Sequence, residues 1–170
     1  MAVRNVHERL LRGVPAEQVG ALVDGLAGTD DRLWPGRHWP PMRLDGPLAT
    51  GAAGGHGPIR YTVEEYVAGR WARFRFDNRR EVDGFHEFTV HEQPDGTLLR
   101  HTLSVSLHGQ ARLGWPLVIR WLHDALLEEL LDNAERATTG TVRRPARWSS
   151  YVRVLRRVLG IDQRAVAGVR

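Results

Sequence analysis

Two histidines have neighbours that suit acid–base or ligand-orienting chemistry. His101 alternates with apolar residues along positions 98–108, which predicts that it lies on the buried face of a strand. His86 alternates with Phe88 and Val90 in the same way, on an expected neighbouring strand. Because an imidazole titrates near neutral pH, a buried one can orient a ligand carbonyl or act as an acid or a base. His101 is therefore the best catalytic candidate, and the competing interpretation is a hydrogen-bonded core histidine without chemistry.

Glu65 is a third polar candidate, because the expected strand 59–67 places it on one face with Tyr61 and Val63. Burial on a cavity wall raises the pKa of a carboxyl group, so that it can donate a proton. A register shift of one residue would exchange the two faces of this strand. The inward residues would then be Thr62, Glu64 and Tyr66.

The residue types argue against several other classes of site. The chain of 170 residues has no cysteine, which excludes disulfides, thiolate catalysis and cysteine-ligated metals. Two histidines and a carboxylate are in principle a metal set, but the spacing of His86, His101 and Glu92 matches no ligand motif. No metal and no cofactor is therefore predicted. The glycine-rich stretch 51–57 has no lysine, so we expect a flexible turn and not a phosphate-binding loop.

Trp34, His38 and Trp39 belong to a proline-rich loop that spans residues 33–47. Aromatic residues in such a loop can form a portal to a ligand cavity. The equally weighted alternative is that the two tryptophans plug one end of the core. The prolines restrict loop motion in both cases.

The elements that must position these residues follow from hydropathy patterns and turn residues. Pro15 suits the first turn of a helix, whose apolar positions continue at helical spacing to Leu26. A long amphipathic helix is predicted from residue 115 to about 138. The dipeptide Asp95-Gly96 marks a hairpin turn. The expected strands are 3–11, 42–44, 59–67, 71–76, 85–92 and 98–108.

This order of elements resembles the START-like, or SRPBCC, superfamily, which includes birch-pollen-allergen-type proteins and the polyketide cyclase/dehydrase group. Four segments between residues 3 and 138 carry the resemblance. They are the turn and helix start Pro15–Val19, the strand pair around a Gly-Arg turn Tyr61–Phe76, the segments Gly84–Val90 and Asp95–Leu103, and the helix end Leu130–Glu135. The first turn, Arg12–Pro15, is one residue longer than is usual in that superfamily.

The resemblance implies an α+β helix-grip fold, in which a curved antiparallel sheet of about seven strands surrounds the long C-terminal helix. Members mostly bind apolar small molecules, such as lipids or polyketides, in a cavity between sheet and helix. We therefore expect an apolar ligand, with polyketide cyclase or aromatase activity as the enzyme alternative. A core filled by bulky side chains would keep the fold without binding a small ligand. The expected lining is Tyr61, Val63, Glu65, Phe74, Phe76, His86, Phe88, Val90, His101, Leu103, Val105, Trp121 and Leu122.

Charge divides the chain into an acidic body and a basic tail. Residues 1–140 carry 16 arginines and 19 acidic residues, whereas residues 141–170 carry 8 arginines and one acidic residue. The net charge of +4 therefore describes the tail and not the body. We expect a helix-grip domain over residues 1–140, followed by an Arg-rich linker and a short basic amphipathic helix over residues 141–170, which are read as a separate unit.

Several partners remain open for this basic helix. It would dock on the domain or on a second copy in a homodimer, contact another protein, or lie on an anionic membrane through Arg153, Arg156 and Arg157. Nucleic acid is disfavoured because no aromatic platform accompanies the arginines. No apolar run approaches the roughly 20 residues of a membrane-spanning helix. The N-terminus also lacks a signal-peptide core, which predicts a cytoplasmic protein.

Overall fold

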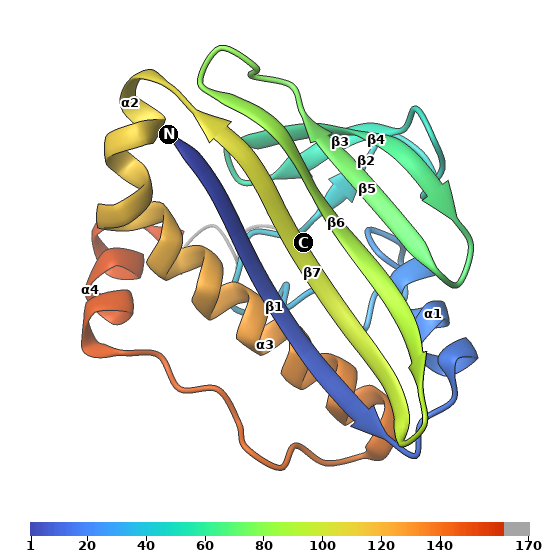
Figure 1. The fold of residues 1–170 in the computed structure, drawn as a ribbon. Helices are drawn as coiled ribbons and strands as arrows, with labels where there is room; N and C mark the ends of the chain where they lie inside the picture. The colour runs from blue at the N-terminus through green and yellow to red at the C-terminus, as the bar shows by residue number, and fades with distance from the viewer. Residues whose placement is uncertain (162–170) are drawn as a thin grey trace.

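The computed structural model describes residues 1–161 and contains a seven-stranded antiparallel sheet that curves around one long helix (Figure 1). The strand order is β1-β7-β6-β5-β4-β3-β2, so the N-terminal strand pairs with the last one. The helix-grip prediction is confirmed. The strands are β1 (Ala2–Arg12), β2 (Arg43–Leu44), β3 (Ala53–His56), β4 (Ile59–Val67), β5 (Trp71–Phe76), β6 (Val82–Gln93) and β7 (Gly96–Leu107).

The central strands form where apolar and polar residues alternate. β4 and β5 have the predicted bounds, whereas β6 and β7 begin a few residues earlier than predicted. Arg73 and Arg75 pair with Glu87 and Glu64 on the solvated face, as cross-strand partners should. The opposite face is buried, which satisfies the rule that one side of an antiparallel sheet packs on the core.

The expectation of a flexible turn over residues 51–57 is wrong, because β3 forms there and pairs with both β2 and β4. A Cβ atom at Gly54 would lie 2.0 Å from the carbonyl oxygen of Arg43. The glycines therefore permit a close approach of backbones that larger residues would prevent. Hydropathy alternation gives no signal for a strand of this kind.

The first helix, α1 (Ala16–Asp24), begins after Pro15 as predicted. It packs so closely on the β4–β5 turn that a Cβ atom at Gly20 would lie 2.4 Å from the carbonyl oxygen of Gly69. Asp24 fixes the same turn by accepting hydrogen bonds from the Gly69 amide and the Tyr66 hydroxyl. The helix thus holds the end of the β4–β5 hairpin.

The long C-terminal helix starts earlier than the predicted residue 115. It consists of α2 (Gly109–Gly114), a π-helical turn η1 (Trp115–Ile119) and α3 (Arg120–Thr139). The proline at position 116 is accommodated inside the π turn. Gly140 ends α3 in the left-handed conformation, with φ of 78°.

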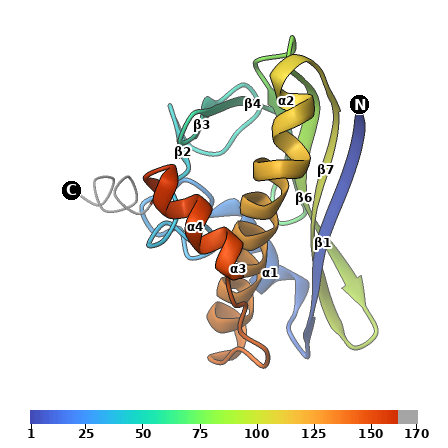
Figure 2. The same ribbon diagram turned by 90° about the vertical axis from the view of Figure 1, so that its left-hand side faces the viewer.

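The C-terminal segment returns to the domain, so the docked interpretation is confirmed for its described part. α4 (Ser150–Val158) is capped by Ser149 and packs against α3 (Figure 2). Arg156 is buried and lies over the rings of Trp39 and Trp148, with 3.9 Å between its guanidinium carbon and the Trp148 ring centroid. The expectation that Arg156 faces a membrane is therefore wrong. Residues 162–170 of the predicted tail lie outside the described residues.

The interior divides into two apolar clusters. The larger one joins α1, α3 and the inward faces of β4, β5 and β6. The smaller one joins β7 to the start of the long helix, and Phe76 packs against both clusters. The buried members of the smaller cluster are Leu103, Val105, Leu107, Ala111 and Trp115.

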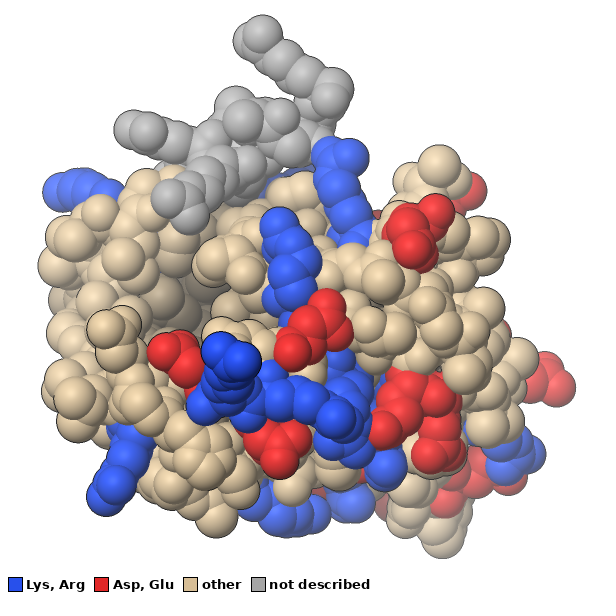
Figure 3. Space-filling model, turned by 90° about the horizontal axis from the view of Figure 1, so that it is seen from above, with Lys and Arg blue, Asp and Glu red and all other residues tan. Residues whose placement is uncertain are grey.

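Arginines and carboxylates are interspersed on the face seen from above (Figure 3). This face of the described chain therefore offers no broad surface of one charge to a polyanion. Among the residues that the structure describes, no helix is long and apolar enough to cross a membrane.

Candidate functional site

A row of histidines crosses the interior between the sheet and α3. His101 on β7 lies next to His86 on β6, with 3.3 Å between Nε2 and Nδ1. On the other side of His101, its ring centroid lies 5.3 Å from that of His123 on α3. The His123 ring lies 5.8 Å from the ring of His7 on β1. Four histidines from four elements thus lie in sequence across the core.

The row continues toward β3 through a tyrosine. The Tyr61 ring contacts the His86 ring edge-on, with 4.9 Å between centroids. The Tyr61 hydroxyl hydrogen-bonds Nδ1 of His56 over 3.2 Å. His56 is therefore a fifth histidine in the same interior row.

The pairing of β6 with β7 explains why His86 and His101 meet. Phe88 lies opposite His101 and His86 lies opposite Leu103 in the antiparallel register. Neighbouring inward positions on paired strands are within reach of long side chains. The expectation that the two histidines lie close together is confirmed, and the His86 ring also stacks on Phe74 at 4.9 Å.

Burial controls the ionisation of this row. It is the largest cause that lowers the pKa of His86 and of His101 well below the ordinary value, and neighbouring histidines lower both further. The pKa of His56 falls to about 4 for the same reasons. Buried His123 also has a lowered pKa, although Asp124 opposes the shift. These four imidazoles are neutral near pH 7 and each can donate one hydrogen bond and accept another.

Three nitrogens of the row are buried without a hydrogen-bond partner. They are Nε2 of His86, Nδ1 of His101 and Nδ1 of His123. Buried polar atoms are nearly always hydrogen-bonded in folded proteins, so each exception suggests an interaction with a group from outside the chain. The three atoms lie where the two apolar clusters meet, because the histidines contact Phe74 and Phe88 on one side and Trp115 on the other.

Most of the expected lining faces inward. Tyr61, Val63, Phe74 and Phe88 are buried in the larger cluster, and Phe76, Val90 and Leu122 pack against it. Leu103 and Val105 are buried in the smaller cluster.

Two expected lining residues lie outside the interior. Glu65 is exposed, because β4 has a bulge between Val63 and Glu65 that reverses the alternation and turns Tyr66 toward the core. Trp121 is 45% exposed and packs on Tyr151 of α4. The inward orientation predicted for both residues is therefore wrong.

The proline-rich loop is tied to α3. Trp39 is buried and its indole donates to Glu129, while His38 binds the same carboxylate with 3.0 Å between Nδ1 and Oε1. Trp34 is buried as well and donates to the carbonyl oxygen of Pro40 over 3.0 Å. The two tryptophans thus pack as the plug alternative describes, and a portal role for this loop stays a prediction.

The surface of the described chain has hollows beside the proline-rich loop and on the sheet. One of about 850 Å³ lies between the proline-rich loop and α3, and its lining includes Trp34, His38, Glu129 and Arg136. Another, of about 350 Å³, involves the outer side of β4 and β5. Neither of these hollows is lined by the three histidines with unpartnered nitrogens.

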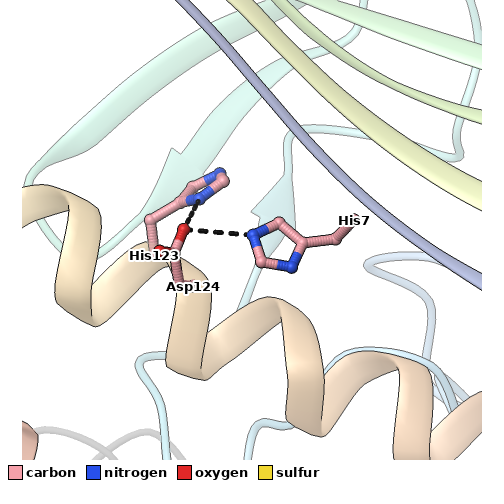
Figure 4. A group of neighbouring side chains, drawn as sticks. All are labelled: His7, His123 and Asp124. Carbon is pink, nitrogen blue, oxygen red and sulfur yellow. Dashed lines mark hydrogen bonds and ion pairs between the residues drawn. The ribbon is translucent and has the colours of Figure 1, made fainter.

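Sequence reasoning missed His7, which Figure 4 shows beside His123 and Asp124. His7 hydrogen-bonds two carboxylates of α3, with 3.0 Å from Nε2 to Asp124 Oδ1 and 2.8 Å from Nδ1 to Glu128 Oε1. Burial alone would lower the pKa of His7, but the two carboxylates raise it to about 9. A signal was present, because carboxylates recur every four residues at 124, 128 and 132, and His7 and Arg9 alternate on one face of β1.

Comparison with known proteins identifies the fold through structural similarity alone. No family model and no curated protein sequence matches the chain. Norcoclaurine synthase from Thalictrum flavum, solved with dopamine and hydroxybenzaldehyde, superposes with a TM-score of 0.60 and 12% identity over 80% of this chain and 86% of that one. A Thermobifida fusca protein gives 0.58 with 16% identity over 85% and 99% of the two chains.

CalU16 from Micromonospora echinospora matches nearly the whole length of both chains. The TM-score is 0.54 with 14% identity, and the match covers 99% of this chain and 97% of that one. The shared fold is the helix-grip fold. Identities this low establish the fold alone, and the chemistry of the interior has to be argued from the residues of this chain.

Proposed function

We propose that this START-like protein binds an apolar small molecule with one polar group, between the sheet and α3. The observation that carries the proposal is the pair of inward nitrogens, Nε2 of His86 and Nδ1 of His101, which are buried without partners. Such an atom costs about 1–3 kcal/mol of stability, and a ligand carbonyl or hydroxyl group would satisfy it.

The surroundings of these nitrogens define the chemical class of the ligand. Aromatic rings of Tyr61, Phe74 and Phe88 contact the two histidines, so burial of apolar area supplies most of the affinity. The histidines are neutral and bring no charge, so the ligand is uncharged at its bonded group. A planar molecule with a carbonyl or phenolic group fits, and hydroxybenzaldehyde is one example.

The π-helical turn η1 supports a binding role for this end of the row. A π turn inserts an extra residue into a helix and is found frequently at functional sites. Trp115 of η1 is buried and its ring lies 5.8 Å from that of His123. A rearrangement of this turn would give a ligand access to the row.

Native mass spectrometry of the freshly purified protein, followed by organic extraction, tests the proposal. We expect an additional mass that leaves on denaturation. For protein purified without a ligand, added hydroxybenzaldehyde should shift the His86 and His101 resonances in NMR spectra recorded during the titration. The variant His101→Leu should bind about tenfold more weakly, because one hydrogen bond to the ligand is lost.

The control variant is His91→Gln, because His91 is exposed on β6 and hydrogen-bonds only its neighbour Thr89. It should bind like the unmodified chain. A bare mass together with unshifted His86 and His101 resonances would contradict the proposal and favour a filled core. If the protein is a cyclase or aromatase, His101→Ala should abolish turnover while apolar ligand binding persists.

We also propose that the surface formed by the start of the long helix, residues 113–121, and α4 binds anionic membranes, because it combines exposed apolar side chains with positive charge. Leu117 is 62% exposed and Val158 is 75% exposed. The long helix and α4 form one surface, since the rings of Trp121 on α3 and Tyr151 on α4 are in contact and the Tyr151 hydroxyl donates to the carbonyl oxygen of Leu117 in η1. Its apolar residues are Leu113, Leu117, Trp121, Tyr151, Val154 and Val158.

The positive charge of the C-terminal segment, residues 141–161, favours an anionic membrane as the partner. Residues 141–161 contain six arginines and no acidic residue. Arg153 and Arg157 are exposed beside the apolar residues of α4. Apolar and aromatic side chains that enter a membrane interface, with arginines at the headgroup level, are typical of helices that lie on anionic lipid.

Vesicle sedimentation tests this surface with phosphatidylcholine alone and with added phosphatidylglycerol. Binding is expected only to the anionic vesicles. The double variant Arg153→Gln/Arg157→Gln should bind about thirtyfold more weakly, from about 1 kcal/mol per arginine. The matched control is Arg79→Gln/Arg80→Gln, which neutralises two exposed arginines before β6. Equal loss in both double variants, or a dimer that forms through this surface without vesicle binding, would refute the membrane role.

A further inference from the structure

We propose that His7, His123 and Asp124 bind a divalent transition-metal ion, for which Zn²⁺ is the best fit. The three residues lie where β1 crosses α3, and both histidines direct a ring nitrogen toward the Asp124 carboxylate, which lies between them (Figure 4). The ligand atoms are Nε2 of His7, Nδ1 of His123 and a carboxylate oxygen of Asp124. This inference does not depend on the proposed ligand, which uses His86 and His101.

The separations of the ligand atoms suit a metal of this size. Asp124 Oδ1 lies 3.0 Å from His7 Nε2 and 3.6 Å from His123 Nδ1, and all three ligand atoms lie within 4.8 Å of one another. Bonds of about 2.0–2.2 Å in a tetrahedron place neighbouring ligand atoms about 3.4 Å apart. The site closes when the three ligand atoms, which lie within 4.8 Å of one another, move to this separation.

One ligand atom lacks a hydrogen bond of normal length. Nδ1 of His123 is buried without a hydrogen-bond partner, although the Asp124 carboxylate is its neighbour. The side-chain oxygen of Asn5 is likewise buried and unpartnered, while the Asn5 amide donates to Asp124 Oδ1 over 3.0 Å. Two unsatisfied buried atoms beside one carboxylate indicate that a further positive group fits among them.

The second layer of contacts resembles that of established metal sites. Glu128 holds Nδ1 of His7 at 2.8 Å, which leaves Nε2 as the atom directed at the metal position. A carboxylate behind a metal-binding histidine fixes its orientation and raises its basicity. Metal binding would replace the proton of His7 Nε2, which leaves to solvent, while Nδ1 keeps its proton for Glu128.

The local charge also favours a cation. Asp124, Glu128, Asp132 and Glu135 follow one another along α3 and face β1. Arg9 binds the last three of these carboxylates, and Arg120 lies 3.6 Å from Asp124 on the exposed side. The four carboxylates carry more negative charge than the two arginines neutralise, and His7 becomes neutral when it binds the ion. A divalent ion would therefore balance the remaining negative charge.

The donor set selects the ion. Two imidazoles and one carboxylate suit Zn²⁺ or Fe²⁺ and do not suit Ca²⁺ or Mg²⁺, which prefer oxygen ligands. Three protein ligands leave a fourth position open, as in catalytic zinc sites. The three ligand residues are partly buried, and the ring of His123 lies next to that of His101. An ion bound there would therefore be close to the interior row of histidines.

Isothermal titration tests the site with the untagged full chain after treatment with EDTA. Zn²⁺ should bind in a 1:1 ratio at about pH 8, because metal ligands must be deprotonated. Histidine NMR of the unmodified chain should show that Zn²⁺ shifts the resonances of His7 and His123 and leaves His91 unchanged. This measurement needs no variant and is therefore independent of any loss of folding.

Variants then separate a metal site from an ion pair. Binding should be lost in Asp124→Asn, and Glu128→Gln should weaken it about 10–100-fold through His7. The matched controls His91→Gln and Asp83→Asn alter an exposed histidine and an exposed carboxylate of β6 and should bind normally. Absence of stoichiometric Zn²⁺ uptake, or uptake that leaves the His7 and His123 resonances unshifted, would overturn the proposal and leave His7 as an ion-pair residue only.

Discussion

Acidification of the metal-free protein from pH 7.5 to about pH 5 is expected to unfold it, because four buried histidines stay neutral in the fold. Burial lowers the pKa of His56 to about 4, lowers those of His86 and His101 well below the ordinary value, and also lowers that of His123. Below about pH 6.5 the unfolded chain binds protons at these positions and the folded chain does not. Each such histidine lowers the free energy of unfolding by about 1.4 kcal/mol per pH unit.

The four histidines together give a slope of about 5 kcal/mol per pH unit, which is comparable with the whole stability of an ordinary domain. His7 acts in the opposite sense, since its raised pKa of about 9 stabilises the fold below pH 6.5 and this contribution is lost as the pH rises toward 9. It therefore cannot offset the loss in acid. Stability should pass through a maximum near neutral pH.

Urea unfolding at a series of pH values, with EDTA present, measures this slope. The double variant His86→Phe/His101→Leu keeps similar volumes and removes two of the four histidines, so about half of the acid-dependent loss should disappear. His91→Gln is the control, because His91 is exposed and its loss should leave the slope unchanged. An acid transition that is the same in the double variant and in the unmodified chain would show that other groups control it.

Periodicity was sufficient for the elements whose burial follows a regular pattern. β4, β5 and the inward row of β7 follow alternation, because one face of each packs on the core. Periodicity was insufficient where backbone geometry determines which residues pair or face the core. β3 depends on glycines that admit neighbouring strands, and the bulge in β4 turns Glu65 outward without any change in composition.

The candidate site shows the same division. The proximity of His86 and His101 followed from two adjacent strands, since neighbouring strands of one hairpin must pair. His7 and His123 could not be placed in the same way, because their contact depends on which part of α3 crosses β1. β1 is an edge strand that pairs with β7, and the part of α3 that lies beside it depends on the packing of the whole sheet, which local sequence patterns do not specify.

The second large effect is expected for Asp132, which joins β1, α3 and the segment before α4. Its carboxylate is 8% exposed, accepts from Arg9 Nη1 at 2.6 Å, and accepts from the amide of Ala146 at 2.7 Å. Asp132→Ala removes one partner of a buried ion pair and leaves the Ala146 amide without an acceptor. We expect a loss of about 3 kcal/mol in the free energy of unfolding, because Arg9 keeps Glu135 and Glu128 as partial compensation.

Asp132→Asn separates the two contributions, because an amide oxygen can still accept from Ala146 while the charge facing Arg9 is gone. Its loss should be smaller than that of Asp132→Ala, and the Ala146 amide should keep its protection from hydrogen exchange. The matched control is Asp95→Ala, which breaks the exposed pair of Asp95 with Arg12, another arginine of β1, and should cost less than about 1 kcal/mol. Equal stability of Asp132→Ala and Asp95→Ala in urea unfolding would mean that the α3 carboxylates do not hold β1 and the C-terminal segment together.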